Sequence, residues 1–286
     1  GTGKSFFAQC IHNGSPRAKK PYIVINAGTI AQQDAARVLF GSDDGAKPRM
    51  GLFELAGGGT IALQGLGDAS EAFFSCLRQV LLQHSYFAVG GVTTIPFSAR
   101  LLALVTPEER RRIPRDLWDQ LSVFSLNLPL LKDRQEDVST LFRFFLLRES
   151  ILMPPRTQKE LEEILSFYSW PANLISLSAV SKRYILLYQQ AMNPSPSAKQ
   201  QILIRAIGED ELLSDIYRQY PALTDAANSP PEEVLAGVAA MKRILKYNNS
   251  VIADKLGLGR TTLWRIQKKA GVSDAGEDTD SPEPIE

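Results

Sequence analysis

Short apolar runs alternate with helix-like segments over about the first 130 residues of this 286-residue chain. Each parallel pair of strands needs a long crossover, which is usually a helix, so this alternation favours a parallel sheet. The pattern therefore predicts an α/β domain over residues 1–133, with helices flanking both faces of the sheet. The expected strands are residues 21–26, 60–63 and 99–105, and the expected helices are residues 6–12 and 72–83.

The pattern becomes helical over residues 134–192, where apolar side chains recur at three- and four-residue spacing. Residues 193–230 carry many Pro, Ser and Asn residues, and we expect a connector with one helix-like piece near residues 209–220. Residues 273–286 hold six acidic side chains and no basic one, which predicts a disordered acidic tail.

Residues 231–272 have the pattern of three short helices. The second and third are separated by the tight turn Gly257-Leu258-Gly259, and Leu263 and Ile266 form the inward stripe of the third. Two helices joined by a short glycine-containing turn form the helix-turn-helix, whose second helix enters the major groove of DNA. The expected helices are residues 232–246, 251–256 and 260–270, with Gly271 ending the last.

Basic side chains are concentrated in this C-terminal segment. The whole chain has a net charge of only +1, but residues 232–272 hold eight basic and three acidic residues. Basic groups on a helix pair favour phosphate contacts, and polar groups near the start of the third helix favour base edges. The alternative is a plain three-helix unit with a solvated basic face. The candidate DNA-binding residues are Arg260, Thr261, Thr262, Trp264, Arg265 and Lys268.

The chain begins with Gly1-Thr2-Gly3-Lys4-Ser5, followed by an apolar helix and a strand. This pentapeptide matches the second half of the phosphate-binding loop G-x-x-x-x-G-K-[ST], in which backbone amides surround phosphate oxygens. Lys4 would reach the terminal phosphates and Ser5 would hold Mg²⁺. The first glycine of the motif is absent, so we expect that an upstream part of the natural protein precedes this sequence.

Six further motifs occur in order along the chain. They are Leu39-Phe40-Gly41, residues 51–56 (GLFELA), 58–63 (GGTIAL), 128–138 (LPLLKDRQEDV), 170–174 (WPANL) and 253–264 (ADKLGLGRTTLW). With these motifs the chain resembles the bacterial enhancer-binding proteins, the AAA+ activators of sigma-54 RNA polymerase. The resemblance implies an AAA+ α/β domain, a helical lid over residues 134–192 and an all-α Fis-type DNA-binding domain over residues 231–272. It also implies that ATP is hydrolysed and that an upstream sensory domain exists.

The chain departs from that family at positions that serve ATP hydrolysis and contact with sigma-54. Gln64 and Gly65 stand where the family has an Asp-Glu pair that holds Mg²⁺ and polarises water, and neither can act as a base. Residues 42–50 lead directly into Gly51, so the family's GAFTGA loop is missing. Further replacements are Thr106 for an Asn, Pro114 and Gln120 for two arginine-finger residues, and Ile175 for a lid arginine.

These departures predict a degenerate family member that is not an enzyme, with no catalytic residue and a doubtful Mg²⁺ site. Lys4 leaves two alternatives open, either ATP or ADP held as a structural ligand or a surface lysine at a helix start. We predict a sequence-specific DNA-binding transcriptional regulator that acts independently of sigma-54. The alternatives are an ATP-hydrolysing sigma-54-dependent activator, with an acid such as Asp68 replacing Gln64, and a sensor of nucleotides or cyclic di-GMP.

The expected partners are double-stranded DNA, RNA polymerase and further copies of the chain, in a dimer or a hexamer. No run of 18 apolar residues occurs, so no membrane partner is expected. Cys10 and Cys76 are too few for a disulfide framework and fit the reducing cytoplasm of a bacterium, at its nucleoid. His12 and His84 have no partner at metal-ligand spacing, so we expect no metal site and place both at the surface or at helix ends.

Overall fold

The computed structural model describes residues 1–43, 47–192 and 194–269. The expected acidic tail and the expected helix end at Gly271 lie outside these residues. The chain divides into two compact units, Gly3–Leu128 and a second unit made of Gly1–Thr2 and Pro129–Glu286. Each unit has its own hydrophobic core. In the part of the chain that the structure describes, no helix combines the length and the apolar character needed to cross a membrane.

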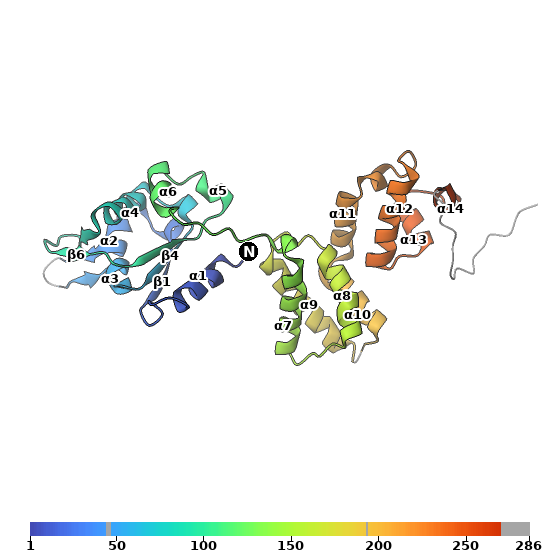
Figure 1. Ribbon diagram of the computed structural model, residues 1–286, viewed down its shortest axis with the longest axis horizontal. Helices are drawn as coiled ribbons and strands as arrows, with labels where there is room; N and C mark the ends of the chain where they lie inside the picture. Colours follow the sequence, from blue (N-terminus) through green and yellow to red (C-terminus); the bar gives the residue numbers. More distant parts are fainter. Residues whose placement is uncertain (44–46, 193, 270–286) are drawn as a thin grey trace, which may run out of the picture. The chain divides into compact units, whose positions relative to one another are not determined.

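A three-stranded parallel sheet forms the centre of the first unit (Figure 1). The strands β1 (Tyr22–Asn26), β4 (Thr60–Gln64) and β7 (Arg100–Ala103) are hydrogen-bonded in the order β1-β4-β7. Helices occupy the crossovers between them, as the alternating pattern requires. The predicted parallel sheet with flanking helices is therefore confirmed.

The two faces of the sheet pack against different helices. Along β4, Ile61 and Leu63 are fully buried in the hydrophobic core of the first unit. Thr60 contacts α1 (Lys4–Asn13) on the other face of the sheet. His12 of α1 is also buried, with its Nδ1 2.9 Å from the Oγ1 of Thr60. Of the two places expected for His12, the helix end is confirmed, since it lies in the last turn of α1, and the surface is wrong, because its ring is buried against the sheet.

The predicted helix after the second strand is α4 (Glu71–Gln83), which packs on α2 (Ala35–Phe40) in the hydrophobic core of the first unit. Ser70 caps its start, because the Ser70 Oγ accepts a hydrogen bond from the backbone N–H of Phe73. The remaining elements are the helices α3 (Leu52–Ala56), α5 (Pro107–Arg110) and α6 (Arg115–Leu121), the 3-10 turns η1 (Ala27–Thr29), η2 (Gln32–Asp34) and η3 (Leu66–Asp68), and the hairpins β2 (Gly41–Ser42) with β3 (Arg49–Met50) and β5 (Ser85–Phe87) with β6 (Thr94–Pro96).

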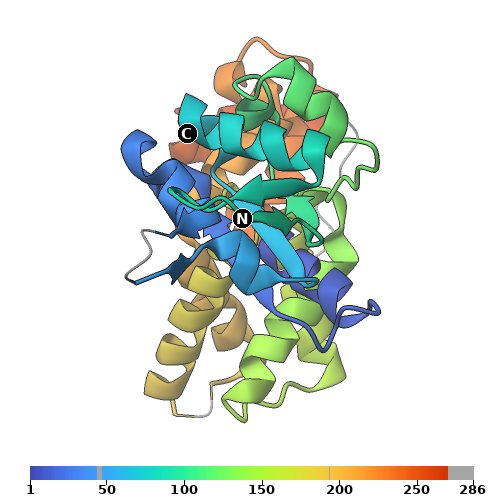
Figure 2. The ribbon, with the colours of Figure 1, turned by 90° about the vertical axis from the view of Figure 1, so that its left-hand side faces the viewer.

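Four helices pack side by side in the second unit, drawn in green and yellow in Figure 2. Between the second and third of them, Trp170 is 2% exposed and adopts a φ of 51°. Its Nε1 donates a hydrogen bond of 2.9 Å to the carbonyl oxygen of Leu165, and its ring packs against Tyr168. Trp170 is therefore part of the core of the helix bundle, at the connection between its second and third helices. The helices of the bundle are α7 (Gln135–Arg148), α8 (Pro155–Phe167), α9 (Leu174–Gln190) and α10 (Pro196–Ile207), preceded by the 3-10 turn η4 (Leu131–Asp133).

The interval 193–230, expected to be a connector, is instead mostly helical. It contains α10, α11 (Glu209–Gln219) and the 3-10 turn η5 (Pro221–Asp225). The proline and serine that suggested a connector begin α10, because Pro196 occupies the first turn and the Ser195 Oγ accepts from the backbone N–H of Ala198.

Three helical segments follow, as predicted, at the C-terminal end of the described chain. They are α12 (Pro231–Ala240) with its π-helical continuation η6 (Met241–Leu245), α13 (Asn249–Lys255) and α14 (Arg260–Lys269). Asn248 caps α13 by accepting a hydrogen bond of 2.9 Å from the backbone N–H of Val251. The last α-helical residue before the π-turn is Ala240, whereas a regular helix was expected to continue to Lys246.

Candidate functional site

The predicted phosphate-binding loop leads directly into α1. Gly3 precedes the helix with a φ of 98°, a conformation that favours glycine, and no side chain of the described residues caps the helix start. Lys4 is the first helical residue, and the first turn contains no acidic side chain. Free amides and the positive end of the helix dipole together favour an anion at such a terminus. Gly3, Lys4 and Ser5 therefore lie at a helix start whose amides and dipole favour an anion.

The end of β4 lies beside this loop. Gln64 is the last residue of β4, and its Nε2 donates a hydrogen bond of 3.0 Å to the Oγ of Ser5. Gly65 follows with a φ of 63°, and a Cβ at that position would lie 2.4 Å from the Oδ1 of Asn26. Gln64 therefore touches the serine expected to hold Mg²⁺, while Gly65 has no space for a side chain unless Asn26 moves.

Two nearby polar residues have structural partners. The Oγ1 of Thr106 accepts a hydrogen bond from the backbone N–H of Glu109, and the Glu109 carboxylate accepts one from the backbone N–H of Thr106, so the pair caps α5. Asp68, the acid considered as a replacement for Gln64, forms an ion pair of 2.5 Å with Arg112. Both of those side chains are more than half exposed, so screening by water weakens their attraction.

An arginine links α4 to α6, the helix that contains one of the two arginine-finger positions. The guanidinium of Arg78 forms ion pairs of 2.7 Å with Glu71 and 2.6 Å with Asp116. Its hydrogen bond to Asp116 lowers the pKa of that carboxyl below the ordinary value. On the same helix, the Oε1 of Gln120 is buried and lacks a hydrogen-bond partner among the described residues. Arg78 therefore joins α4 to α6 through Asp116, while Arg115 at the start of α6 is exposed.

Gly1 and Thr2 belong to the second, helical unit and accept hydrogen bonds within it. The carbonyl oxygen of Gly1 accepts a hydrogen bond of 3.0 Å from the backbone N–H of Leu174, and that of Thr2 accepts one of 2.8 Å from the guanidinium of Arg134. Ile175, at the position of the family's lid arginine, is 65% exposed. Sequence reasoning missed the contact with Arg134, because nothing in the spacing of residues 2 and 134 indicates proximity.

Two short paired strands follow α2, at the place where the sequence predicts that the family's sigma-54-contacting loop is missing. β2 pairs antiparallel with β3, so that Gly41 lies opposite Met50. A Cβ on Gly41 would lie 2.2 Å from the carbonyl oxygen of Arg49, and one on Gly51 would lie 2.3 Å from the amide of Gly41. Two glycines are therefore needed where these backbones approach each other.

The candidate DNA-binding residues lie on α14, which follows the turn after α13. Leu263 is buried and Ile266 is half-buried, while Gln267 is buried and donates a hydrogen bond to the Oδ1 of Asn249. The opposite face carries polar and basic groups. Arg260, Thr261, Trp264, Arg265 and Lys268 are exposed, and Thr262 is partly exposed.

One basic side chain of the C-terminal segment forms an ion pair with an acidic side chain of the helical bundle. Arg243 of η6 forms an ion pair of 3.0 Å with Glu163 of α8. The sequence-based count of basic residues treated Arg243 as available to phosphate, and the pairing was not visible because the two residues are 80 positions apart. The other bases of the segment, which are Lys242, Lys246, Lys255 and the four of α14, are exposed.

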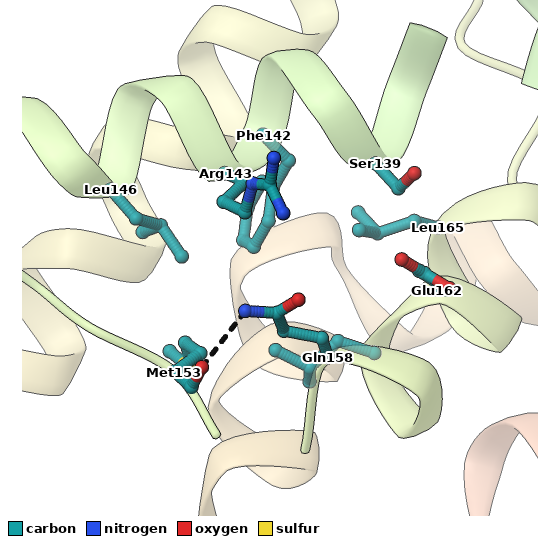
Figure 3. A pocket seen from close by; sticks show the side chains of 9 residues that line it. Ser139, Phe142, Arg143, Leu146, Met153, Gln158, Glu162 and Leu165 are labelled. Atoms are coloured by element: carbon teal, nitrogen blue, oxygen red, sulfur yellow. Dashed lines mark hydrogen bonds between the residues drawn. The ribbon is translucent and has the colours of Figure 1, made fainter. Parts of the chain in front are cut away.

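A small pocket opens within the helical bundle (Figure 3). Its volume is about 30 Å³, whereas sites for small ligands usually measure roughly 300–1,000 Å³. Gln158 closes one end by donating a hydrogen bond of 2.8 Å to the carbonyl oxygen of Met153. None of the predicted site residues lines this pocket, and it is too small for a nucleotide.

Residues 1–127 match the family model described as the Sigma-54 interaction domain. The DNA-binding transcriptional activator HyfR of Escherichia coli is 31% identical over 96% of this chain and 43% of its own length. The regulator NtrC of Rhizobium meliloti is 30% identical over 96% of this chain and 63% of its own length. A crystal structure of NtrX from Brucella abortus matches 94% of this chain and 62% of that protein, with a TM-score of 0.61 and 25% identity. The chain thus spans less than two thirds of the relatives that it matches.

The prediction that the chain is not an enzyme is contradicted by these matches. The match to the Sigma-54 interaction domain covers every replaced position except Ile175, and NtrX, which shares the fold, has been crystallised with ADP and with ATP. The error arose because a few replaced side chains, above all Gln64 and Gly65, were given more weight than the domain as a whole. Residues 1–127 therefore resemble a Sigma-54 interaction domain, and the chain is similar over 96% of its length to DNA-binding transcriptional regulators.

Proposed function

We propose that this chain is a nucleotide-binding, sequence-specific DNA-binding regulator of transcription of the bacterial enhancer-binding type. The observation that carries the proposal is α14, a helix that follows a short turn, buries Leu263 and exposes Arg260, Arg265 and Lys268 on the opposite side. This arrangement suits a recognition helix in the major groove, with basic side chains directed at phosphates. The similarity to HyfR and NtrC, both named as DNA-binding regulators, supports it.

The proposed nucleotide is ATP or ADP. The amides around Gly3 and at the start of α1 would donate to phosphate oxygens, Lys4 would neutralise the terminal phosphates, and Ser5 would offer its hydroxyl to Mg²⁺. The absence of acidic residues from the first turn of α1 fits a polyanionic ligand. The complexes of NtrX with ADP and ATP support the same assignment.

Replacing Gln64 with aspartate should make ATP binding more dependent on Mg²⁺. The shorter, charged side chain would accept a hydrogen bond from Ser5 and attract the cation, whereas without Mg²⁺ it would repel the triphosphate. We expect the ratio of ATP affinities with and without Mg²⁺ to rise about tenfold, a difference of roughly 1.4 kcal/mol. Isothermal titration calorimetry in Mg²⁺ and in EDTA measures this ratio. Gln83→Asp, at an exposed glutamine at the end of α4, is the control, and an unchanged ratio for Gln64→Asp would place the cation elsewhere.

Single alanine substitutions at Arg260 and Arg265 should weaken operator binding by about 1–3 kcal/mol where a base contact is lost. Where a phosphate contact is lost, the slope of log affinity against log salt concentration should become shallower by about one. An operator is first selected from random duplexes with the native chain, and binding is then titrated at several salt concentrations. Arg205→Ala, an exposed arginine on α10, is the matched control. Native affinity and salt slope in both α14 variants would refute the recognition-helix assignment.

We also propose that regulation does not require sigma-54, because the short β2–β3 hairpin occupies the place of the contacting loop. The second candidate function is an ATP-driven, sigma-54-dependent activator, which the match over residues 1–127 favours. Transcription from an operator-bearing promoter separates the two candidates. Stimulation of only the sigma-54 holoenzyme, together with phosphate release from ATP, would establish the second, and an effect on only the housekeeping holoenzyme would establish the first.

A further inference from the structure

Trp264 lies on the outer face of α14 and is 51% exposed, the most exposed of the chain's three tryptophans. Trp170 is buried, and Trp118 is partly buried beneath the guanidinium of Arg110. The neighbouring Leu263 belongs to the hydrophobic core of the helical unit, whereas Trp264 does not. Packing within the described chain therefore does not explain a large aromatic ring at this position.

The ring shares one helical face with the exposed polar and basic groups of α14. Thr261, Trp264, Arg265 and Lys268 are spaced at i, i+3, i+4 and i+7, which aligns side chains along one side of a helix. The ammonium nitrogen of Lys268 lies 4.8 Å from the centroid of the Trp264 ring. Such a cation–π contact restrains an exposed ring, so Trp264 is held within the basic surface.

The charge of this face selects the partner. The sequence of α14 contains four basic residues and no acidic one, so the surface complements a polyanion. Major-groove base edges present hydrogen-bonding groups and one distinctive apolar group, the 5-methyl of thymine. An aromatic ring among basic side chains on a recognition helix suits that methyl group. The ring supplies dispersion contact, while the lysine and arginine side chains hold the phosphates.

We propose that Trp264 reads the 5-methyl group of a thymine in the major groove of the operator. The inference rests on the proposed DNA-binding function and adds a sequence preference to it. Each half-site would contain one thymine whose methyl group packs on the indole ring, and Lys268 would keep the ring oriented while its ammonium faces the DNA backbone. The selectivity comes from the methyl group alone, since uracil pairs with adenine identically but lacks that group.

The test begins with selection of high-affinity duplexes from a random pool by the full chain. Each thymine of the selected operator is then replaced, one at a time, by deoxyuridine, and binding is measured by fluorescence anisotropy at constant salt. Loss of one buried methyl group should weaken binding by about fourfold at one position per half-site. The Trp264→Ala variant should bind more weakly overall and show no response to deoxyuridine there, whereas Arg265→Ala should keep the fourfold response.

The outcomes separate this inference from the function on which it rests. If the pool shows no enrichment, the proposed DNA-binding function itself is overturned. If an operator is selected but no thymine responds to deoxyuridine, or if Trp264→Ala responds as the native chain does, the methyl-reading role of Trp264 is overturned while DNA binding stands. Far-ultraviolet circular dichroism verifies that the variants are folded. We expect Trp264→Ala to fold, because the side chain that it removes is half-exposed.

Discussion

Replacing Lys4 with alanine should lower the affinity for ATP and ADP by about 100-fold, which corresponds to roughly 2.7 kcal/mol. The ammonium group stands at the start of α1, where no acidic side chain of the first turn competes with phosphate for it. A charge-assisted hydrogen bond of this kind contributes on the order of 1.5–3 kcal/mol. The remaining amides of the loop would retain only weak binding of the nucleotide.

Calorimetric titration with ATP and with ADP measures the effect of this substitution. Lys19→Ala, an exposed lysine beyond the end of the same helix, is the matched control and should bind as the native chain does. The titration also decides between the two interpretations of Lys4, since a mere surface lysine could be removed without effect. Equal nucleotide affinities for Lys4→Ala and Lys19→Ala would eliminate the phosphate-binding role of the loop.

Replacing Trp170 with alanine should destabilise the helical unit by about 3–5 kcal/mol. The ring is almost completely buried against Tyr168, and its Nε1 satisfies the carbonyl oxygen of Leu165. Truncation would leave a cavity and a carbonyl without its partner, and the two costs add. Urea denaturation monitored by circular dichroism measures this effect, and we expect a lower midpoint for the variant.

Trp264→Ala provides the matched comparison for this stability measurement, because it removes the same side chain from the same unit at a half-exposed site. Its loss should change the free energy of unfolding by less than about 1 kcal/mol, the usual range for a surface position. If the two variants unfold at the same urea concentration, Trp170 does not stabilise the core of the helix bundle as described.

The parts of the fold that follow from local pattern were predictable from the sequence. The strands at residues 22–26 and 60–64 and the helices α1 and α4 occur where apolar periodicity indicated them. The start of α10 was not recognised, because Pro and Ser were taken as connector residues although they are also helix-start residues. Periodicity also gives no signal for a π-turn, so η6 was missed.

The candidate sites were predictable to a smaller extent. The exposed face of α14 followed from the positions of Leu263 and Ile266, since the stripe opposite the core must face outward. The hydrogen bond between Gln64 and Ser5 and the ion pair between Arg243 and Glu163 depend on tertiary contacts between distant positions. Inference of lost hydrolysis from isolated replacements failed for a related reason, because a side chain's role depends on the whole domain around it.

The contacts of α11 bear on where this chain can be divided. The hydroxyl of Tyr217 donates to the carbonyl oxygen of Lys255 at the end of α13, and the hydroxyl of Tyr247 donates to Glu209 at the start of α11. Leu212 and Ile216 of α11 are fully buried. A recombinant fragment cut at residue 231, the boundary that sequence pattern suggests, would strip this helix from its neighbours. A fragment that keeps α12, α13 and α14 with their packing partners should therefore begin before Gly208.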